Sequence, residues 1–287
     1  MNPGLIAQIA CTFEVCARKP GNVHRGADFE DVGLVDFLLS AAAIAGPMGR
    51  ARELGVGRTI LEAVGVTRAV VRTNTNLGMI LLLAPLAAVP EGSDLRTGVA
   101  EVLESTTVED TRLVYRAIRM ARPGGLGEVD DQDVAGEPTI GLVDAMRLAA
   151  DRDLVARQYA NGYADVFDCA LPALRARLSA GLPLETAIIG AHLALLASRP
   201  ETLIARKLGA EMADEARRLA SDVVAGGWPE APGSAARFDR LDAWMRDDGH
   251  ARNPGASADL VTAALFAAVT DGTIELPRPG GPPGWSG

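Results

Sequence analysis

Hydrophobic residues recur at intervals of three and four along most of the chain, which is the spacing of amphipathic helices. Few segments show the alternating, β-branched pattern of strands. The pattern predicts helices at about 3–17, 32–46, 57–72, 77–88, 95–104, 107–121, 139–150, 152–179, 184–197, 201–225, 235–247 and 257–270. We therefore expect an all-α protein that folds as a single large multi-helix bundle.

Polar residues at the predicted helix starts support several of these helices. Thr106 and Glu109 have the spacing of a capping box. Asp151 or Asp153 is suited to cap the segment that follows, and Ser257 follows a Pro-Gly turn at the start of the last helix. These signals predict where the helices begin to within a few residues.

Two loops and a tail interrupt the helical pattern. Residues 122–138 hold Gly, Pro and the acidic residues Glu128, Asp130, Asp131 and Asp133, and residues 226–233 are rich in Gly and Pro. We interpret the first as a long functional loop, because helices of the same kind flank it. Residues 276–287 contain four prolines and four glycines. We expect this tail to be disordered and the helical domain to cover 1–275.

Charge and composition narrow the class of protein. The chain has 28 basic and 37 acidic residues, a net charge of −9, which disfavours nucleic acid and anionic membranes as partners. Three cysteines without metal-ligand spacing argue against a disulfide framework or a zinc site. We find no secretory signal, and the longest apolar stretch, residues 77–89, is too short to span a membrane. A cytoplasmic protein is expected.

Three polar segments stand out from the Ala- and Leu-rich background: Lys19–Arg25, Thr73–Gly78 and Asp247–Asp259. Each lies at a predicted helix boundary, where free backbone N–H groups and the helix dipole can bind anions. The alternative is that the polar residues only cap helices and turns.

The first segment contains residues suited to phosphate. Lys19 and Arg25 are able to hold phosphate oxygens, Gly21 allows a ligand to approach the backbone, and His24 can donate a hydrogen bond or carry a proton. We interpret His192, inside an apolar helix, as a core or interface histidine with its hydrogen bonds satisfied.

The other two segments offer uncharged donors and a carboxylate. Asn74 and Asn76 precede a wholly apolar helix and could face a nucleotide or share a metal shell. Asp259 lies one turn into the last predicted helix, where a carboxylate can bind magnesium that bridges phosphates or stabilise positive charge on a sugar. The common nucleotide and hydrolase motifs, including G-x-x-x-x-G-K-[ST] and G-x-S-x-G, are absent.

Taken together, Glu14 with the motif Lys19–His24, Asn74–Gly78 and Asn253–Leu260 resemble the triphosphoribosyl-dephospho-CoA synthase family in order and spacing. The resemblance spans nearly the whole chain. It implies an all-α enzyme that uses ATP as a ribosyl donor, expels adenine, and joins the triphosphoribose to the 2′-hydroxyl of 3′-dephospho-CoA. ATP as substrate and Mg²⁺ are the implied ligands.

The resemblance also implies roles for individual residues. The catalytic residues would be Asp259, Glu14 and His24, and Asp259 and Glu14 would also bind the metal. The substrate-binding residues would be Lys19, Gly21, Asn22, Arg25, Asn74, Asn76, Gly78, Asn253, Gly255 and Ser257. Asp28 and Asp248 are additional candidate carboxylates.

Departures from the family pattern leave alternatives open. Asn76-Leu77 stands where citrate-lyase-type members have a His-Lys pair, which removes a cation. Residues 107–167 resemble a sub-branch from tetrahydromethanopterin-using organisms, so the acceptor could be CoA-like or pterin-like, in the biosynthesis of tetrahydromethanopterin or methanofuran. A glycosidic-bond hydrolase that uses the acidic loop and a purely structural bundle are the other hypotheses. The alanine-rich helices are compatible with a homodimer.

Overall fold

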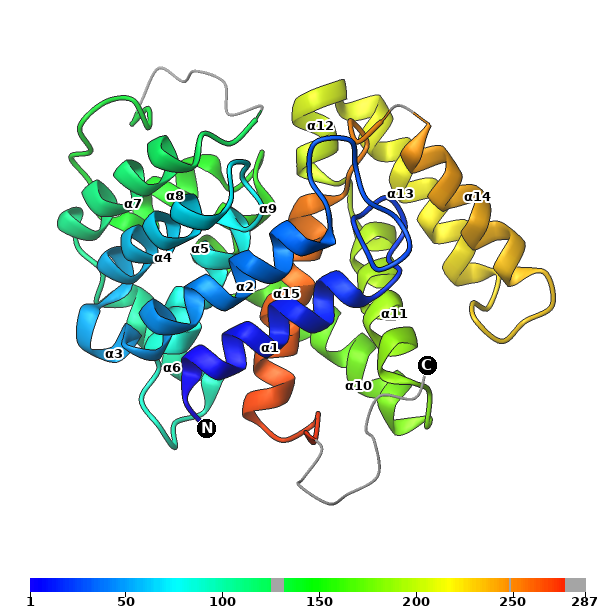
Figure 1. The fold of residues 1–287 in the computed structure, drawn as a ribbon, viewed down its shortest axis with the longest axis horizontal. Helices are drawn as coiled ribbons and strands as arrows, with labels where there is room; N and C mark the ends of the chain where they lie inside the picture. The colour runs from blue at the N-terminus through cyan, green and yellow to red at the C-terminus, as the bar shows by residue number, and fades with distance from the viewer. Residues whose placement is uncertain (125–131, 248, 277–287) are drawn as a thin grey trace.

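A computed structural model describes residues 1–124, 132–247 and 249–276 (Figure 1). These residues contain no strand, so the all-α prediction is confirmed. The helices are α1 (Pro3–Cys16), α2 (Leu34–Gly49), α3 (Ala51–Leu54), α4 (Val56–Val70), α5 (Leu77–Ala88), α6 (Leu95–Glu104), α7 (Val108–Ala121), α8 (Leu142–Ala149), α9 (Leu154–Asn161), α10 (Leu171–Ser179), α11 (Leu184–Ser198), α12 (Thr202–Leu208), α13 (Ala210–Ala225), α14 (Ser234–Arg246) and α15 (Gly255–Thr270). A π-helical turn, η1 (Val166–Ala170), precedes α10.

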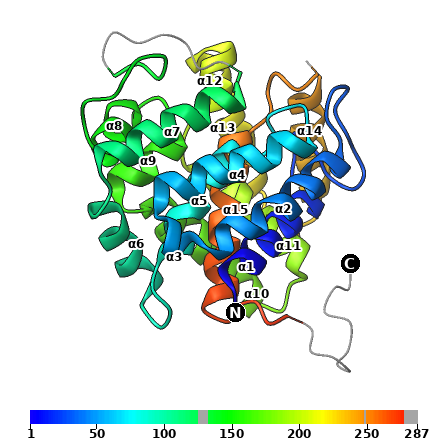
Figure 2. The same cartoon turned by 60° about the vertical axis from the view of Figure 1, so that its left-hand side comes forward.

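Helix α15 lies at the centre of the bundle in both views (Figures 1 and 2). Its residues from Leu260 to Val269 are all buried, and it packs against α1, α5, α9, α10, α11 and α12. Helix α5 is likewise buried on nearly all sides. A helix that is apolar all round belongs in a core, and the sequence of both helices has this character. The last helix of the chain is therefore the one around which the others assemble.

The single helix predicted at 152–179 is wrong, because the chain breaks it into α9, η1 and α10. Gly162 and Tyr163 both adopt positive φ, which ends α9. The hydroxyl of Tyr159 donates to the carbonyl of Leu81 at 2.5 Å, and that of Tyr163 donates to Leu82 at 2.9 Å. Pro85 lacks the N–H that would pair with Leu81, so Tyr159 satisfies a carbonyl that α5 cannot.

Other helix boundaries differ in smaller ways. The predicted helix 201–225 is two helices that meet at Gly209, whose φ is +93°. The short helix α3 was not predicted. The capping box before α7 is formed by Thr107 and Asp110, not by Thr106 and Glu109. Asp153 caps α9, as predicted for one of two aspartates.

Helices α4 and α7 lie side by side and run in the same direction. The backbone N–H of Gly57 at the start of α4 donates to the Asp110 carboxylate at the start of α7, at 2.9 Å. A Cβ at Gly57 would lie 2.7 Å from the Asp110 backbone, so only glycine allows this approach. The C-terminal ends of both helices consequently meet on one side of the bundle, beside the start of α5.

Several predictions fall outside the described residues. Glu128, Asp130 and Asp131 of the acidic loop and the candidate Asp248 are among these. Leu276 packs against the core, and residues 277–287 of the predicted tail lie beyond the described part, so the domain limits stay a prediction. None of the described helices has the length and apolar character needed to cross a bilayer.

Candidate active site

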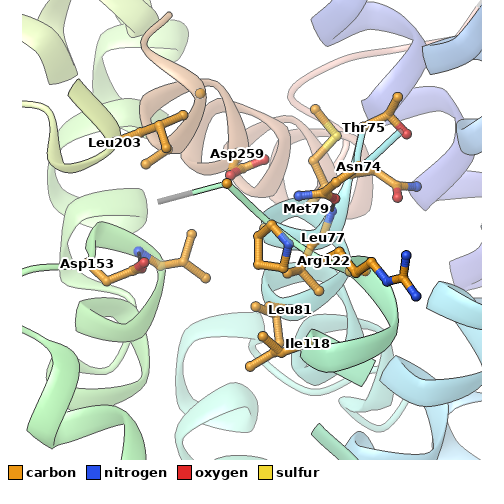
Figure 3. A pocket seen from close by; sticks show the side chains of 18 of the residues that line it. Asn74, Thr75, Leu77, Met79, Leu81, Ile118, Arg122, Asp153, Leu203 and Asp259 are labelled. Atoms are coloured by element: carbon orange, nitrogen blue, oxygen red, sulfur yellow. Dashed lines mark hydrogen bonds between the residues drawn. The ribbon is translucent and has the colours of Figure 1, made fainter. Parts of the chain in front are cut away.

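A cavity of about 700 Å³ lies beside the first turn of α15 and the start of α5. Its walls come from α1, the segment between α4 and α5, α7, α8, α9, α12 and α15. All three polar segments singled out in the sequence contribute side chains to it, among them Asn22, Asn74 and Asp259. Figure 3 shows Asp259 between Asn74 on one side and Leu203 on the other. The fold thus brings together residues that are far apart in sequence.

Asp259 projects from α15 onto the N-terminal turn of α5. The backbone N–H of Met79 donates to its carboxylate. A Cβ at Gly78 would lie 1.9 Å from Oδ2 of Asp259, so the missing side chain of Gly78 makes room for the carboxylate. The positive end of the α5 dipole faces this negative charge.

The pKa of Asp259 is raised well above the usual range for aspartate. Burial is the main cause, followed by the negative charge of Glu14 and then by Asp153 and Glu201. The charged form is therefore costly in the cavity without a ligand, and positive charge beside it would be stabilised. A strongly perturbed carboxylate in a cleft is a candidate catalytic group.

Glu14 lies behind Asp259 and is paired with Lys19. The Lys19 ammonium is 2.9 Å from Oε1 of Glu14 and also donates to the backbone carbonyls of Glu14 and Ala17. Both side chains are buried, and burial raises the pKa of Glu14 while the charge of Lys19 opposes this shift. All three Lys19 donors are used, and Lys19 does not line the cavity. This arrangement does not support the predicted binding of phosphate by Lys19.

The two other charged or titratable residues of the Lys19–Arg25 segment, His24 and Arg25, do not line the cavity. His24 accepts a hydrogen bond from the backbone N–H of Gly26 at Nδ1, and burial is the main cause that lowers its pKa to about 4. A neutral imidazole outside the cavity does not fit the predicted catalytic role. Arg25 pairs with Glu185 of α11 at 2.6 Å and also lies outside the cavity.

Gly21 and Asn22 have different surroundings. Gly21 has a φ of +71°, and a Cβ there would lie 2.7 Å from Met245, so its small size serves packing against α14 instead of ligand approach. Asn22 does line the cavity, and its Nδ2 lies 3.4 Å from Nε2 of His192. His192 is a core residue, as predicted. Its Nδ1 has no hydrogen-bond partner among the described residues, so the expectation of a satisfied histidine is wrong for that atom.

The middle segment lines the cavity, and its contact with a nucleotide or a metal shell stays a prediction. Oδ1 of Asn74 accepts the N–H of Leu77 at 3.2 Å, and Nδ2 of Asn76 donates to Thr67 at 3.3 Å. Asn74 is exposed toward the opening, whereas Asn76 is buried. Asn74 therefore both caps the start of α5 and forms part of the cavity wall.

The last segment was expected to form a phosphate site at the start of α15. Instead, Oε1 of Glu201 accepts the backbone N–H groups of Ala256 and Ser257 at 2.8 and 3.2 Å. Ser257 is buried, does not line the cavity, and lies inside the first turn instead of capping it. This helix start already holds a carboxylate, which leaves no N–H at these two positions for phosphate. Asn253 and Gly255 do line the cavity.

Sequence reasoning missed Glu201. Its other oxygen accepts the N–H of Ile204, so one side chain joins the starts of α12 and α15. Burial raises its pKa to about 7 against the effect of these backbone hydrogen bonds. The only signal in the sequence was its place at the first residue of the helix predicted at 201–225. Asp28, an additional candidate, accepts the N–H of Leu34 at the start of α2 and lies outside the cavity.

Three arginines on one side of the cavity were also missed. Arg68 and Arg72 lie at the C-terminal end of α4, and Arg122 lies at the end of α7. The Arg68 guanidinium donates to the backbone carbonyl of Arg72, and within the described part of the chain none of the three forms an ion pair. Arg122 is on the same side of Asp259 as Asn74 in Figure 3. We call Arg68, Arg72 and Arg122 the arginine rim.

The opposite side and the floor of the cavity have other properties. Arg206 of α12 pairs with Asp153, and Lys207 follows it. Below Asp259, Figure 3 shows the apolar side chains of Leu81 and Ile118. The apolar floor consists of Leu77, Leu81, Ile118, Leu142, Met146 and Val155. Such a surface suits an uncharged ring or chain and limits the access of water.

The described residues do not form a metal site by themselves, since no three His, Cys, Asp or Glu side chains cluster in a suitable way. Glu14 and Asp259 are close enough for the charge of one to raise the pKa of the other, and both face the cavity. Magnesium is commonly held by one or two carboxylates together with substrate phosphates. The residues fit an ion bound in that way.

An all-α fold around a cavity that combines a carboxylate of raised pKa with a rim of arginines is the arrangement expected of an enzyme with a phosphate-bearing substrate. The family model for ATP:dephospho-CoA triphosphoribosyl transferase matches residues 2–277, and the chain belongs to this family. It is therefore a transferase of the triphosphoribosyl-dephospho-CoA synthase type, whose reaction moves a triphosphoribosyl group from ATP to dephospho-CoA. The transfer to a one-carbon cofactor precursor is not favoured by this match.

A solved structure supports the fold. It is provisionally named triphosphoribosyl-dephospho-CoA synthase and comes from Archaeoglobus fulgidus. The TM-score is 0.62 with 22% sequence identity, and the match covers 82% of this chain and 99% of the other. No curated protein matches the chain significantly.

Proposed function

We propose that triphosphoribosyl transfer takes place beside Asp259, with the ribose of ATP between this carboxylate and the apolar floor. The bond between the ribose C1′ and adenine breaks, and adenine leaves with the bonding electrons. A bond forms between C1′ and the 2′-oxygen of dephospho-CoA. The hydroxyl proton passes to the Asp259 carboxylate and then, through water, to the departing adenine.

The position of Asp259 is the observation that supports this proposal most strongly. Its carboxylate is held by the N–H of Met79 against Gly78, with Glu14 behind it. Positive charge develops on the ribose as adenine leaves, and a carboxylate whose charged form is disfavoured by burial gains most from that charge. Its raised pKa also makes it a better proton acceptor for the hydroxyl.

The arginine rim is the place proposed for the triphosphate. Arg68, Arg72 and Arg122 provide three guanidinium groups, which match phosphate oxygens well. Asn74 lies on the same side as Arg122 and contributes an amide at the opening. We thus assign the role first expected of Lys19 and Arg25 to arginines at the C-terminal ends of α4 and α7.

Magnesium is part of the proposal through Asp259 and Glu14, the two carboxylates that would hold it. When bound, the ion would neutralise phosphate charge. The ion pair with Lys19 opposes the effect of burial on the pKa of Glu14.

We also propose a cytoplasmic homodimer. A cytoplasmic location agrees with the use of ATP as substrate. Exposed apolar side chains on α1, α2 and α4, three helices that pack together, support the dimer: Leu5, Val35, Leu39, Val66 and Val70. Light scattering coupled to size exclusion tests the dimer, and a monomer at micromolar concentration would contradict it.

Mass spectrometry of the purified protein tests the reaction. The protein is incubated with ATP and magnesium, with and without 3′-dephospho-CoA. We expect free adenine and a triphosphoribosyl adduct of dephospho-CoA, both dependent on the acceptor. Adenine release without the acceptor would indicate hydrolysis, and no adenine in either sample would contradict triphosphoribosyl transfer from ATP.

A further inference from the structure

The cavity has a second polar side that the assignment of the triphosphate does not use. Arg206 and Lys207 at the end of α12 and Asn253 before α15 line it. In Figure 3, Leu203 of α12 and Asp153 lie across Asp259 from Asn74 and Arg122. The reacting position beside Asp259 is therefore flanked by two separate polar regions.

Unsatisfied polar atoms mark this second region. Nε of Arg206 and Oδ1 of Asn253 are buried and have no hydrogen-bond partner among the described residues. Native proteins satisfy most buried polar atoms, so each exception needs an explanation such as a missing ligand. Both residues line the cavity, and of the two atoms the donor, Nε of Arg206, is the one that suits an anion.

The charges around Lys207 are also incompletely neutralised. Its ammonium donates to the backbone carbonyl of His250 at 3.4 Å, and the described residues provide no ion-pair partner within salt-bridge distance. The charges of Glu201 and Asp31 favour its charged form, and the charge of Arg206 opposes it. Burial lowers the pKa of Lys207, so an anion beside it would stabilise its charged form.

The neighbouring Arg206 is held in place by an ion pair with Asp153, the residue that caps α9. This pair fixes the guanidinium plane and leaves Nε as its unsatisfied donor. Lys207 then supplies the positive charge that Asp153 does not neutralise. The region is less positive than the arginine rim, so it suits a smaller anion.

Two phosphate-bearing substrates have to meet at Asp259. The donor carries a triphosphate, and the acceptor carries a diphosphate between its nucleoside and its pantetheine arm. If both shared the arginine rim, their charges would repel each other and the reacting atoms would lie on the same side. Separate anion sites on either side of Asp259 avoid this repulsion.

We propose that Arg206 and Lys207 form a second anion subsite that binds the diphosphate of the acceptor. This proposal rests on the proposed function, in which the arginine rim binds the triphosphate of ATP. In this proposal Lys207 contributes to the affinity for the acceptor, and the arginine rim determines the affinity for ATP.

Lysine labelling tests the subsite directly. The chain has two lysines, and Lys19 is completely buried, so Lys207 is the accessible one. We expect 3′-dephospho-CoA to slow acetylation of Lys207 by an N-hydroxysuccinimide ester about fivefold or more, and ATP to slow it less than about twofold. The N-terminal amine serves as an internal control. Equal protection of Lys207 by 3′-dephospho-CoA and ATP, or protection by ATP alone, would overturn the proposal.

Kinetics of Lys207→Ala provide the second test. We expect the KM for dephospho-CoA to rise about tenfold while the KM for ATP changes by less than about twofold. Lys207→Arg should restore most of the affinity, and Arg218→Ala on the exposed side of α13 is the control. An unchanged KM for dephospho-CoA would overturn the subsite.

The two proposals fail in different ways. If the wild-type protein transfers triphosphoribose but Lys207→Ala weakens ATP as much as dephospho-CoA, only the subsite is wrong. If the wild-type protein neither binds dephospho-CoA in calorimetry nor releases adenine, the proposed function is wrong, and the subsite falls with it.

Discussion

The carboxylate of Asp259 lies against Gly78, so closely that a Cβ at position 78 would be 1.9 Å from Oδ2. Gly78→Ala therefore has to displace the carboxylate from its place at the start of α5. We expect kcat to fall about 100-fold, because a displacement of about 1 Å at a reacting group has effects of that size. Steady-state adenine release measures the effect.

Gly65 provides a matched control for this substitution. It also lies within a helix, α4, but a Cβ there would meet nothing within 4 Å. Gly65→Ala should keep full activity and raise stability slightly, since alanine is the better helix former by about 1 kcal/mol. Full activity in Gly78→Ala would contradict the catalytic role of Asp259 in its observed position.

The pH dependence of the reaction should report Asp259. Because the carboxylate acts in its ionised form and its pKa is raised, activity should fall on the acidic side at a higher pH than for an ordinary aspartate. Glu14→Gln removes a negative charge that contributes to this shift, so the pKa of Asp259 falls and the acidic limb moves to lower pH.

The measurement is the pH profile of kcat/KM for both proteins. Glu104→Gln, an exposed position on α6, is the control and should leave the profile unchanged. An acidic limb of Glu14→Gln that stays in place or moves to higher pH would show that Asp259 does not control it.

Substitutions of Lys19 and Arg122 should have different effects: the first should lower stability, and the second should weaken ATP binding. Lys19→Met leaves Glu14 buried without its partner, so we expect a loss of about 3–5 kcal/mol of unfolding free energy and little change in the KM for ATP. Arg122→Ala should leave stability nearly unchanged and raise the KM for ATP about tenfold.

Urea unfolding and steady-state kinetics distinguish these effects. The double variant Lys19→Met with Glu14→Gln should recover part of the lost stability, because no buried charge is then left unpaired. Arg116→Ala is the control for the kinetics, because Arg116 is exposed on α7, the helix that has Arg122 as its C-cap. A large rise in the KM for ATP in Lys19→Met would return the phosphate role to Lys19.

Glu201 should make stability depend on pH. Its pKa is 4.5 in an ordinary setting and about 7 in the folded protein, so the folded state binds the proton more tightly. Its contribution is fully present below about pH 4.5 and is lost as the pH rises through 7, with a total of about 3 kcal/mol. Glu201→Gln should remove this part of the dependence in urea unfolding at several pH values. Equal slopes for both proteins would contradict the shift.

The helical pattern of the sequence was sufficient to predict the fold class and most helices, because the apolar spacing of α4, α7 and α15 depends only on neighbours in the chain. The break at Gly162 could not be predicted in this way. It depends on the hydroxyls of two tyrosines that reach carbonyls of α5, and Tyr159 satisfies the carbonyl left free by Pro85. Such pairing links residues about 80 positions apart.

The candidate site was predictable in part for a similar reason. Polar residues at helix ends indicated the segments that converge, and Asn74 and Asp259 line the cavity. The sequence could not show that Lys19 would form a buried ion pair with Glu14. Nor could it show that the Glu201 carboxylate would accept the backbone N–H groups at the start of α15. Both facts depend on which helix end meets which side chain in space, and spacing along the chain carries no such information.

The central claim is that Asp259 is the catalytic carboxylate in the transfer of triphosphoribose from ATP to dephospho-CoA. Adenine release from ATP, measured by chromatography with and without 3′-dephospho-CoA for wild type and Asp259→Asn, tests it most directly. We predict acceptor-dependent adenine release by the wild type and a rate about 1000-fold lower for Asp259→Asn, with its helical circular dichroism and thermal stability retained. Comparable rates for the two proteins, or release that ignores the acceptor, would contradict the account.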